Sequence, residues 1–292
     1  MGDATTNLRP RRSVLYMPSS NERALEKAKS IACDSLIFDL EDAVAPDAKA
    51  SARVNAVAAA RSGEYGHREI TIRCNGLDTP WGAEDVAAAA TSGADAVVIP
   101  KVDSHAYLDE VERHLDVAGA PAGLRIWAMI ETPTALLDIR SIAHHSRVNV
   151  LVMGTNDLIK ELRTAALSDR SPLIPHLATA LVGAREADKV ILDGVYNDVR
   201  DPEGFLTEAR QGRDFGFDGK TLVHPSQVEP ANGVWAPDDA EVEHSRRVIA
   251  AFDEAEAAGR GVITVDGRMI ENLHVDNARR VLAVADAIAA LG

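Results

Sequence analysis

A chain of 292 residues, with 46% hydrophobic and 26% charged side chains, is long enough to bury a large core in a single domain. Its formal net charge of −14 and the lack of a basic stripe exclude nucleic acid as an expected partner. No apolar stretch approaches the roughly 20 residues that span a bilayer, and no apolar core marks a signal peptide, so we expect a cytoplasmic protein with no membrane partner. Cys33 and Cys74 lie in or beside apolar runs and are expected to be reduced core residues.

Short β-rich runs alternate with longer Ala-rich helical runs along most of the chain. The expected strands cover 13–17, 35–40, 69–74, 95–99, 125–130, 148–153, 190–194 and 218–223. The expected helices cover 21–32, 47–61, 82–92, 104–118, 133–144, 172–188 and 202–214. This rhythm predicts a (β/α)8 barrel, because eight repeats close a parallel sheet on itself. An open doubly wound sheet is the alternative, but it usually has an early Gly-rich turn, whereas the turn after the first strand here reads MPSSN.

The chain continues beyond what a minimal barrel needs. Two further helical stretches, 238–259 and 271–290, enclose a short extended piece with the sequence GRGVITVDGRM. We therefore expect a barrel over 1–237 and a C-terminal helical extension over 238–292, within one domain overall. The extension is expected to pack on the barrel and to reach a neighbouring subunit.

Charged residues gather where the expected strands end, which is the edge that carries the active site in such barrels. They are Asp39, Glu41, Asp42, Arg73, Lys101, Glu131 and Asp157. Alternation along the strands turns Arg73 and Asn75 toward the barrel axis and places Glu131 opposite the apolar face of its strand, so Arg73 and Glu131 should converge. Any one of these charges could instead cap a helix or form a surface ion pair, but five carboxylates around one arginine favour a functional cluster.

Crowded carboxylates repel one another unless a cation sits among them. Oxygen ligands without clustered Cys or His indicate a hard ion, Mg2+ or alternatively Mn2+. The nine histidines show no HExxH-like spacing, which argues against zinc. The segment Gly154-Thr155-Asn156-Asp157 opens a helical stretch, where backbone N–H groups can bind a substrate carboxylate and Asp157 can offer an oxygen to the metal. A turn and helix cap is the plainer interpretation of Thr155 and Asn156.

Eight motifs follow one another in an order that is typical of one enzyme family. They are RRSVLYMPSSNERALEKA, FDLEDAVAPDAKASAR, IRCNGLDTPWG, VVIPKV, MIETPTALL, LVMGTNDL, GFDGKTLVHPSQ and DGRMIENLHVDNARRVL. Together they resemble the HpcH/HpaI aldolase/citrate lyase family, specifically its CitE-like branch with malyl-CoA lyase, citramalyl-CoA lyase and the citrate lyase beta subunit. The resemblance extends from Arg12 to about Leu282.

The resemblance implies a Mg2+-dependent (β/α)8 enzyme that assembles as a homotrimer or homohexamer. The implied reaction is reversible Claisen cleavage of a short 3-hydroxyacyl-CoA, such as malyl-CoA or citramalyl-CoA, into a 2-oxo acid and acetyl- or propionyl-CoA. By motif match, Glu131 and Asp157 would bind the metal, and Arg73 would bind the thioester carbonyl and stabilise the enolate. Glu41 and Asp42 would orient metal-bound waters.

The chain departs from the family pattern in two places. Ser19 stands where the family usually has Gly, and Glu271 stands where the C-terminal motif usually has Asp. In the family that Asp acts as acid/base in a neighbouring subunit's site, so the resemblance assigns to Glu271 proton transfer at the thioester α-carbon. The alternative is structural, because an acidic residue is favourable in the first turn of a helix.

Other functions stay open at this point. A citrate lyase beta-type subunit would act on a citryl thioester carried by an acyl-carrier protein, and the other branch of the family cleaves hydroxy-oxo acids without CoA. The same site could direct water at the thioester, and a chain that had lost activity would be an oligomeric CoA-binding protein. Candidates to hold the CoA phosphates are Arg12, Lys27 and Lys101, although a solvated surface position is common for such side chains.

Overall fold

The structure, a computed structural model, describes residues 8–257 and 263–291. It divides into two compact units, of which the larger is Arg11–Val234 and the smaller contains the C-terminal residues from Trp235 onward. Within the described residues, no helix combines the length and the apolar character that crossing a membrane requires.

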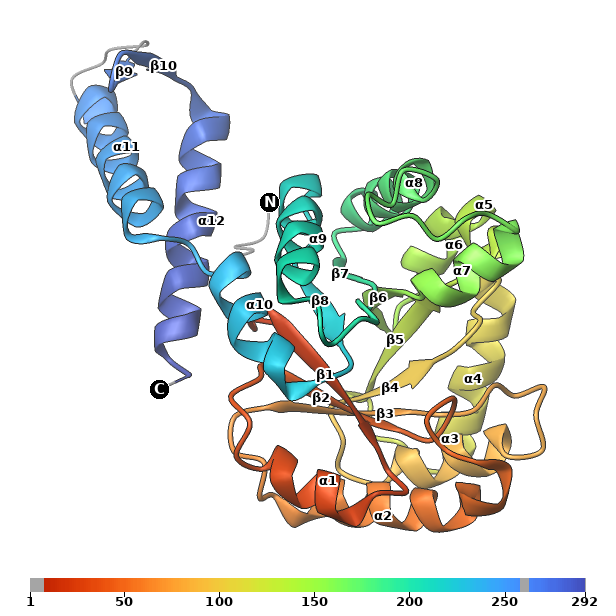
Figure 1. Cartoon of the computed structure of the whole chain (residues 1–292). Coiled ribbons are helices and arrows are strands. Elements are labelled where there is room, and N and C mark those ends of the chain that lie inside the picture. The colour runs from red at the N-terminus through yellow and green to blue at the C-terminus, as the bar shows by residue number, and fades with distance from the viewer. Residues whose placement is uncertain (1–7, 258–262, 292) are drawn as a thin grey trace. The chain divides into compact units, whose positions relative to one another are not determined.

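Eight parallel strands close into a barrel in the larger unit (Figure 1). They are β1 (Ser13–Pro18), β2 (Ser35–Asp39), β3 (Glu69–Arg73), β4 (Ala96–Ile99), β5 (Arg125–Ile130), β6 (Val148–Met153), β7 (Val190–Asp193) and β8 (Gly219–Leu222). Each strand pairs with the next one along the chain, and β1 pairs with β8, so the barrel has no open edge. The predicted (β/α)8 barrel is thereby confirmed, and each predicted strand agrees with the observed one to within a residue at either end.

Helices surround the strands (Figure 1). They are α1 (Glu22–Ala28), η1 (Pro46–Ala48), α2 (Lys49–Ser62), α3 (Gly82–Ala90), α4 (His105–Val117), α5 (Pro133–Leu137), α6 (Ile139–Ala143), α7 (Thr155–Leu162), α8 (Ile174–Glu186), α9 (Pro202–Phe215), η2 (Pro225–Gln227) and α10 (Val228–Trp235). The prediction of one helix over 133–144 is wrong in detail. Asp138 leaves the helical conformation, with φ −107° and ψ 16°, and separates α5 from α6.

Alternate side chains of the strands fill the barrel interior. On β5, Trp127 and Met129 point inward, while Ile126 and Ala128 are buried on the other face. The interior cluster contains Val14, Ile37, Ala96, Val98, Trp127, Met129, Val150, Val152 and Leu192. Since these side chains pack the interior, a ligand has access only at an end of the barrel.

The smaller unit is a helical hairpin with a β-ribbon at its tip. It consists of α11 (Asp239–Ala257), β9 (Ile263–Val265), β10 (Arg268–Ile270) and α12 (Asn272–Ala289). Both residues of the turn between the strands, Asp266 and Gly267, have positive φ values of 50° and 78°, as a type I′ turn requires. The predicted extended piece is therefore an antiparallel pair, although its first residues, 259–262, lie outside the described residues.

A buried ion network ties the end of β7 to β8, α9 and the segment before α8. Lys220 is fully buried, and its Nζ lies 2.9 Å from Asp193 Oδ2 and 2.7 Å from Glu208 Oε1. Arg170 Nη1 donates to the other oxygen of Asp193 at 2.7 Å. Two cations face two carboxylates, so the charges balance without water.

We expect Lys220→Met to lower the free energy of unfolding by about 3–5 kcal/mol, because removing one partner leaves a buried carboxylate uncompensated. Urea denaturation monitored by circular dichroism measures this change. Lys29→Met is the control, since Lys29 pairs with Glu26 and Glu64 at the surface and its loss should shift the midpoint very little. Equal midpoints for the two variants would show that the buried network does not stabilise this end of the barrel.

Candidate active site

A cavity of about 290 Å³ lies at the carboxyl ends of the barrel strands. Eight residues that the sequence singled out line it: Asp39, Asp42, Arg73, Glu131, Gly154, Thr155, Asn156 and Asp157. They come from the ends of β2 and β3, from the residues that directly follow β2, β5 and β6, and from the first turn of α7. The strand alternation therefore predicted correctly that Arg73 and Glu131 meet at this end of the barrel.

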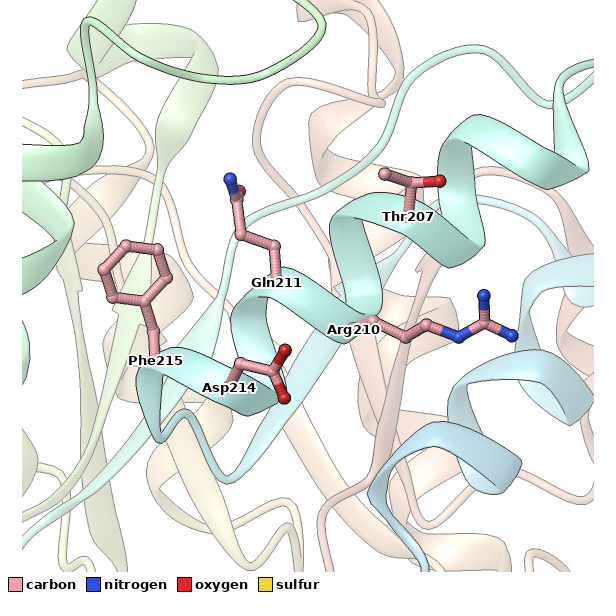
Figure 2. A pocket seen from close by; sticks show the side chains of 5 residues that line it. All are labelled: Thr207, Arg210, Gln211, Asp214 and Phe215. Atoms are coloured by element: carbon pink, nitrogen blue, oxygen red, sulfur yellow. The ribbon is translucent and has the colours of Figure 1, made fainter.

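A larger depression, of about 460 Å³, lies against α9 but lacks the features of a reaction site. Figure 2 shows that its labelled side chains all project from this one helix. They are Thr207, Arg210, Gln211, Asp214 and Phe215. Charged groups from several strands do not converge there. They do converge in the cavity at the carboxyl ends of the barrel strands, which we call the axial cavity and take as the candidate active site.

Arg73 is the buried cation of the axial cavity. Its Nε and Nη2 atoms donate to the two carboxylate oxygens of Asp39, both at 2.6 Å, which is a bidentate fork. Its Nη1 atom lies 2.9 Å from Glu41 Oε2, and the guanidinium carbon lies 4.7 Å from the ring centroid of Tyr16. These contacts on three sides fix the direction of the guanidinium group.

Glu131 is 2% exposed, and its Oε1 atom accepts the backbone N–H of Lys101 at 2.7 Å. Burial raises the pKa of Glu131 to about 8, and the nearby carboxylates of Glu41 and Asp157 add to the effect. Burial likewise raises the pKa of Glu41 to about 7, with Asp42 and Asp39 adding to it and Arg73 opposing it. Burial and the neighbouring carboxylates therefore both disfavour negative charge at these two positions.

Gly154 is required by the position of Glu131. A β-carbon on Gly154 would lie 2.1 Å from Glu131 Oε2 and 2.5 Å from its Cβ, far inside van der Waals contact. The backbone N–H of Gly154 donates to the carbonyl of Ile130 at 3.1 Å, so the main chain of β6 is held against β5 at this point. The absence of a side chain lets Glu131 lie flat against the start of α7.

This arrangement fits a hard divalent cation. Glu131 and Asp157 offer carboxylate oxygens to one cavity, and Asp157 lies in the first turn of α7. Burial raises the pKa of Glu131 and the neighbouring carboxylates add to the shift, so a negative charge at this position is unfavourable without a further cation. An oxygen-only donor pair at this position suits Mg2+ or Mn2+ and does not suit softer metals.

The helix start after β6 also contributes polar groups. Thr155 is buried and lines the cavity, and Asn156 exchanges amide hydrogen bonds of 3.3 and 2.8 Å with Asn197 from the loop after β7. Lys101 has a left-handed backbone with φ 48°, and its Nζ atom lies 3.7 Å from Glu41 Oε1. Its side chain is half exposed, so its fixed contribution to the site is its backbone N–H.

Two residues named from the sequence, Arg12 and Lys27, do not line the cavity. Arg12 precedes β1 at the opposite end of the barrel and pairs with Asp34 at 2.7 Å. Lys27 is exposed in the last turn of α1. Glu271 lies in the smaller unit as the N-cap residue of α12, where its N–H donates to His274 Nδ1 at 3.0 Å.

The expectation that Asn75 faces the barrel axis is wrong. Strand β3 ends at Arg73, so the alternation does not continue to Asn75. Its amide instead donates to Asp85 on α3 at 2.5 Å and accepts from Lys49 on α2 at 2.8 Å. It is therefore part of the packing between β3 and the helix layer.

The sequence analysis did not identify three further polar residues that line the cavity, Tyr16, Asn197 and Thr221. Tyr16 could have been found, because it shares with Val14 the face of β1 that points to the interior. Thr221 lies on β8, and its hydroxyl group donates a hydrogen bond to the carbonyl oxygen of Asp193 at 3.1 Å. Asn197 lies in an irregular loop, where no periodicity indicates the direction of a side chain.

Residues 12–225 match the model of the HpcH/HpaI aldolase/citrate lyase family. The chain belongs to this family. The resemblance that the eight motifs carried is thus confirmed, and the protein is an enzyme of the aldolase and citrate lyase type.

Two curated relatives within this family align over almost the whole chain. A (3S)-malyl-CoA thioesterase of Cereibacter sphaeroides is 50% identical over 281 residues, which are 96% of this chain and 96% of the relative. The citrate lyase beta subunit of Escherichia coli K12 is 34% identical over an alignment that includes 95% of this chain and 94% of the relative. The match therefore includes the C-terminal extension as well as the barrel.

Solved structures of the family have the same architecture. The CitE protein of Mycobacterium tuberculosis, in complex with magnesium, acetoacetate and coenzyme A, is 27% identical, with a TM-score of 0.77 over 94% of this chain and 97% of that one. A citrate lyase of Burkholderia xenovorans, 17% identical with a TM-score of 0.85 over 98% of this chain and 94% of that one, supports the fold alone.

We expect Gly154→Ala to reduce turnover by about a hundredfold while the fold is kept, because the new methyl group must push the Glu131 carboxylate aside and small displacements are costly at reacting centres. Steady-state kinetics and circular dichroism measure the two effects. Gly123→Ala is the matched control, since a β-carbon there meets open space. A fully active Gly154→Ala enzyme would mean that the observed position of Glu131 is not needed for the reaction.

The raised pKa of Glu131 predicts a pH dependence of stability. A folded carboxyl group with a pKa near 8, compared with 4.5 in the unfolded chain, retains its proton where the unfolded chain has lost it. The free energy of unfolding should therefore fall as the pH rises from about 4.5 to about 8 in the absence of divalent ions. Urea titrations at several pH values measure the slope.

Glu131→Gln should flatten that slope, and saturating Mg2+ should flatten it in the parent protein. Glu203→Gln on the exposed side of α9 serves as the control and should keep the slope of the parent. A slope that Glu131→Gln leaves unchanged would assign the effect to other groups.

Proposed function

We propose that this protein is a Mg2+-dependent hydrolase of a short 3-hydroxyacyl-CoA thioester of the malyl-CoA type. The observation that carries the proposal is the 50% identity to a (3S)-malyl-CoA thioesterase over 96% of both chains. The axial cavity supplies the groups that such a reaction needs: one oriented guanidinium and a pair of carboxylates that can share a divalent cation. The sequence favoured carbon–carbon cleavage and left hydrolysis open as an alternative. We now propose hydrolysis as the first candidate.

Arg73 is the group that stabilises the charge formed on the thioester. When water adds to the carbonyl carbon, the carbonyl oxygen becomes negatively charged, and donors already aimed at it lower the barrier. Arg73 is held for this task by Asp39 and Glu41. Collapse of the adduct breaks the C–S bond, so the products are the free hydroxy acid and CoA, whose thiolate takes up a proton.

Glu131 and Asp157 would hold the cation, with Asp42 and Glu41 next to them to orient water. When bound, Mg2+ supplies the positive charge that binds the carboxylate and neighbouring oxygen of the hydroxyacyl group and keeps that end of the substrate in place. The backbone at Gly154, Thr155 and Asn156 presents the start of α7, where N–H groups favour an anionic substrate group.

Glu271 is the proposed proton carrier, contributed by a neighbouring copy in a homotrimer or homohexamer. In hydrolysis it would take the proton of the attacking water, and in carbon–carbon cleavage it would move the proton at the α-carbon. Its carboxylate is about one methylene further from the backbone than that of the aspartate usual in the family. We infer that this displacement affects which of two neighbouring carbons the carboxylate serves, the carbonyl carbon or the α-carbon.

Carbon–carbon cleavage of the same thioester is the second candidate. The match to the aldolase/citrate lyase family and the 34% identity to a citrate lyase beta subunit favour it. Both reactions would use Arg73 and the cation, and they differ only in the bond that breaks. Product analysis therefore separates them.

Incubation with malyl-CoA and Mg2+ should release malate and free CoA, and chelation of divalent ions should stop the reaction. Thiol detection with an organic-acid assay measures these products, and citramalyl-CoA and citryl-CoA define the acyl group. The appearance of glyoxylate and acetyl-CoA in place of malate and CoA would identify the enzyme as a carbon–carbon lyase instead. A full rate without divalent ions would remove the metal from the proposal.

Glu271→Gln should lower hydrolysis by at least about a hundredfold, the usual contribution of a positioned proton-transfer group. Glu271→Asp restores the residue usual in the family and should raise the share of glyoxylate among the products. An equal product ratio in the parent and the Asp variant would show that the length of this side chain does not direct the reaction. The helix start at α12 is monitored by thermal unfolding, so that loss of fold is distinguished from loss of the proton carrier.

A further inference from the structure

We propose that the barrel carries a second metal site, separate from the axial cavity, formed by His105, Asp109 and His145 and suited to Zn2+. One ligand atom from each residue lies within 4.8 Å of the other two. These residues are not among the described residues that line the axial cavity. The proposal therefore does not depend on the proposed function.

Two separate segments build this cluster. His105 and Asp109 are four residues apart on α4, so their side chains share one face of the helix. His145 comes from the turn between α6 and β6. The HExxH motif places its two histidines four positions apart on one helix, so it does not identify a site formed by His105 and His145, which are forty positions apart.

The distances are close to those of a tetrahedral ion. Asp109 Oδ1 lies 3.6 Å from His105 Nε2 and 3.5 Å from His145 Nε2. Metal–ligand bonds of about 2.0–2.1 Å place neighbouring ligand atoms about 3.3 Å apart in tetrahedral geometry. The centroids of the two imidazole rings are 4.9 Å apart, and the ring planes are tilted by 56° to each other. Side-chain shifts of a few tenths of an ångström would bring both nitrogen–oxygen distances to this value, and all three ligand atoms already lie within 4.8 Å of one another.

His105 is already in the tautomer that binds a metal through Nε2. Its Nδ1 atom lies 3.0 Å from the carbonyl oxygen of Ser141, an acceptor, so Nδ1 carries the proton. The lone pair of Nε2 is then available toward Asp109. A backbone carbonyl bound to the far ring nitrogen is the usual support of a metal-binding histidine.

His145 brings a buried nitrogen to the cluster. The residue is 1% exposed, so its imidazole is enclosed by the protein. Its Nε2 atom lies 3.3 Å from Glu112 Oε2 as well, so a second carboxylate is in reach. Its Nδ1 atom accepts the N–H of Arg147 at 3.3 Å, and this long hydrogen bond must open for Nε2 to bind an ion.

The donor set selects the kind of metal. Two imidazoles and a carboxylate suit Zn2+ or its spectroscopic substitute Co2+, whereas Mg2+ prefers oxygen ligands and would stay at Glu131 and Asp157. The side chains of His105 and Asp109 are 42% and 62% exposed, so an ion enters from solvent and water or Glu112 can complete its coordination. A bound ion would tie α4 to the turn before β6.

The test is Zn2+ binding to the full chain after removal of metals, with bound ions counted by equilibrium dialysis and elemental analysis. His105→Ala and Asp109→Asn remove exposed ligands and should leave the fold intact. Each substitution should lower the affinity for one equivalent of Zn2+ by more than about tenfold. His144→Ala is the matched control, because His144 is the neighbouring histidine and pairs with Glu186 instead. It should bind as the parent does.

Glu131→Gln separates this site from the axial cavity. The Glu131→Gln protein should still bind the one equivalent of Zn2+ that the His105→Ala protein no longer binds. It should also show the visible absorption band of tetrahedral Co2+ when Co2+ is added, and its unfolding temperature should rise when Zn2+ is added. The proposal is overturned if His105→Ala and Asp109→Asn bind Zn2+ as tightly and in the same amount as the parent. It is equally overturned if the His144→Ala protein loses the same equivalent of bound Zn2+ as the His105→Ala and Asp109→Asn proteins.

Discussion

The contact between Arg73 and Asp39 determines the arrangement of the axial cavity. A guanidinium that is nine-tenths buried needs a counter-charge, and Asp39, itself 1% exposed, provides it with both oxygens. The same two oxygens also accept the backbone N–H groups of Glu41 and Ala43, at 2.9 and 3.1 Å. One carboxylate thus orients the cation and folds the loop after β2, which brings Glu41 and Asp42 beside it.

The rest of the site is acidic around this pair. Glu131 and Asp157 stand on the other side of the cavity, and Lys101 is the remaining cation that approaches them. Burial raises the pKa of Glu131 to about 8, and the carboxylates of Glu41 and Asp157 add to this shift, so negative charge is unfavourable there in the free protein. A divalent cation bound between Glu131 and Asp157 would relieve the repulsion, so binding of the ion would also complete the proposed site.

The sequence predicted those parts of the site that depend on regular structure. Arg73 and Glu131 follow from period-two alternation in strands whose ends were placed within a residue, and the family follows from the order of its motifs. Asn75 was misplaced because hydrogen bonding in β3 stops two residues earlier, and a pattern of residue types does not show where pairing stops. The Asn156–Asn197 pair and the approach of His145 to α4 join segments far apart in sequence through irregular turns. Such contacts depend on tertiary packing, which a single sequence does not encode as a local period.

Glu131 is positioned by main chain on two sides: the N–H of Lys101 binds one oxygen, and the bare α-carbon of Gly154 leaves room for the other. A main-chain donor is present whatever side chain the residue bears, and glycine or asparagine would adopt the left-handed conformation of position 101 as readily as lysine does. The side chains around the mouth of the barrel can therefore diverge during evolution without disturbing the carboxylate. A lineage of such enzymes can change the acyl group that it accepts, one loop substitution at a time, and keep the same chemistry throughout.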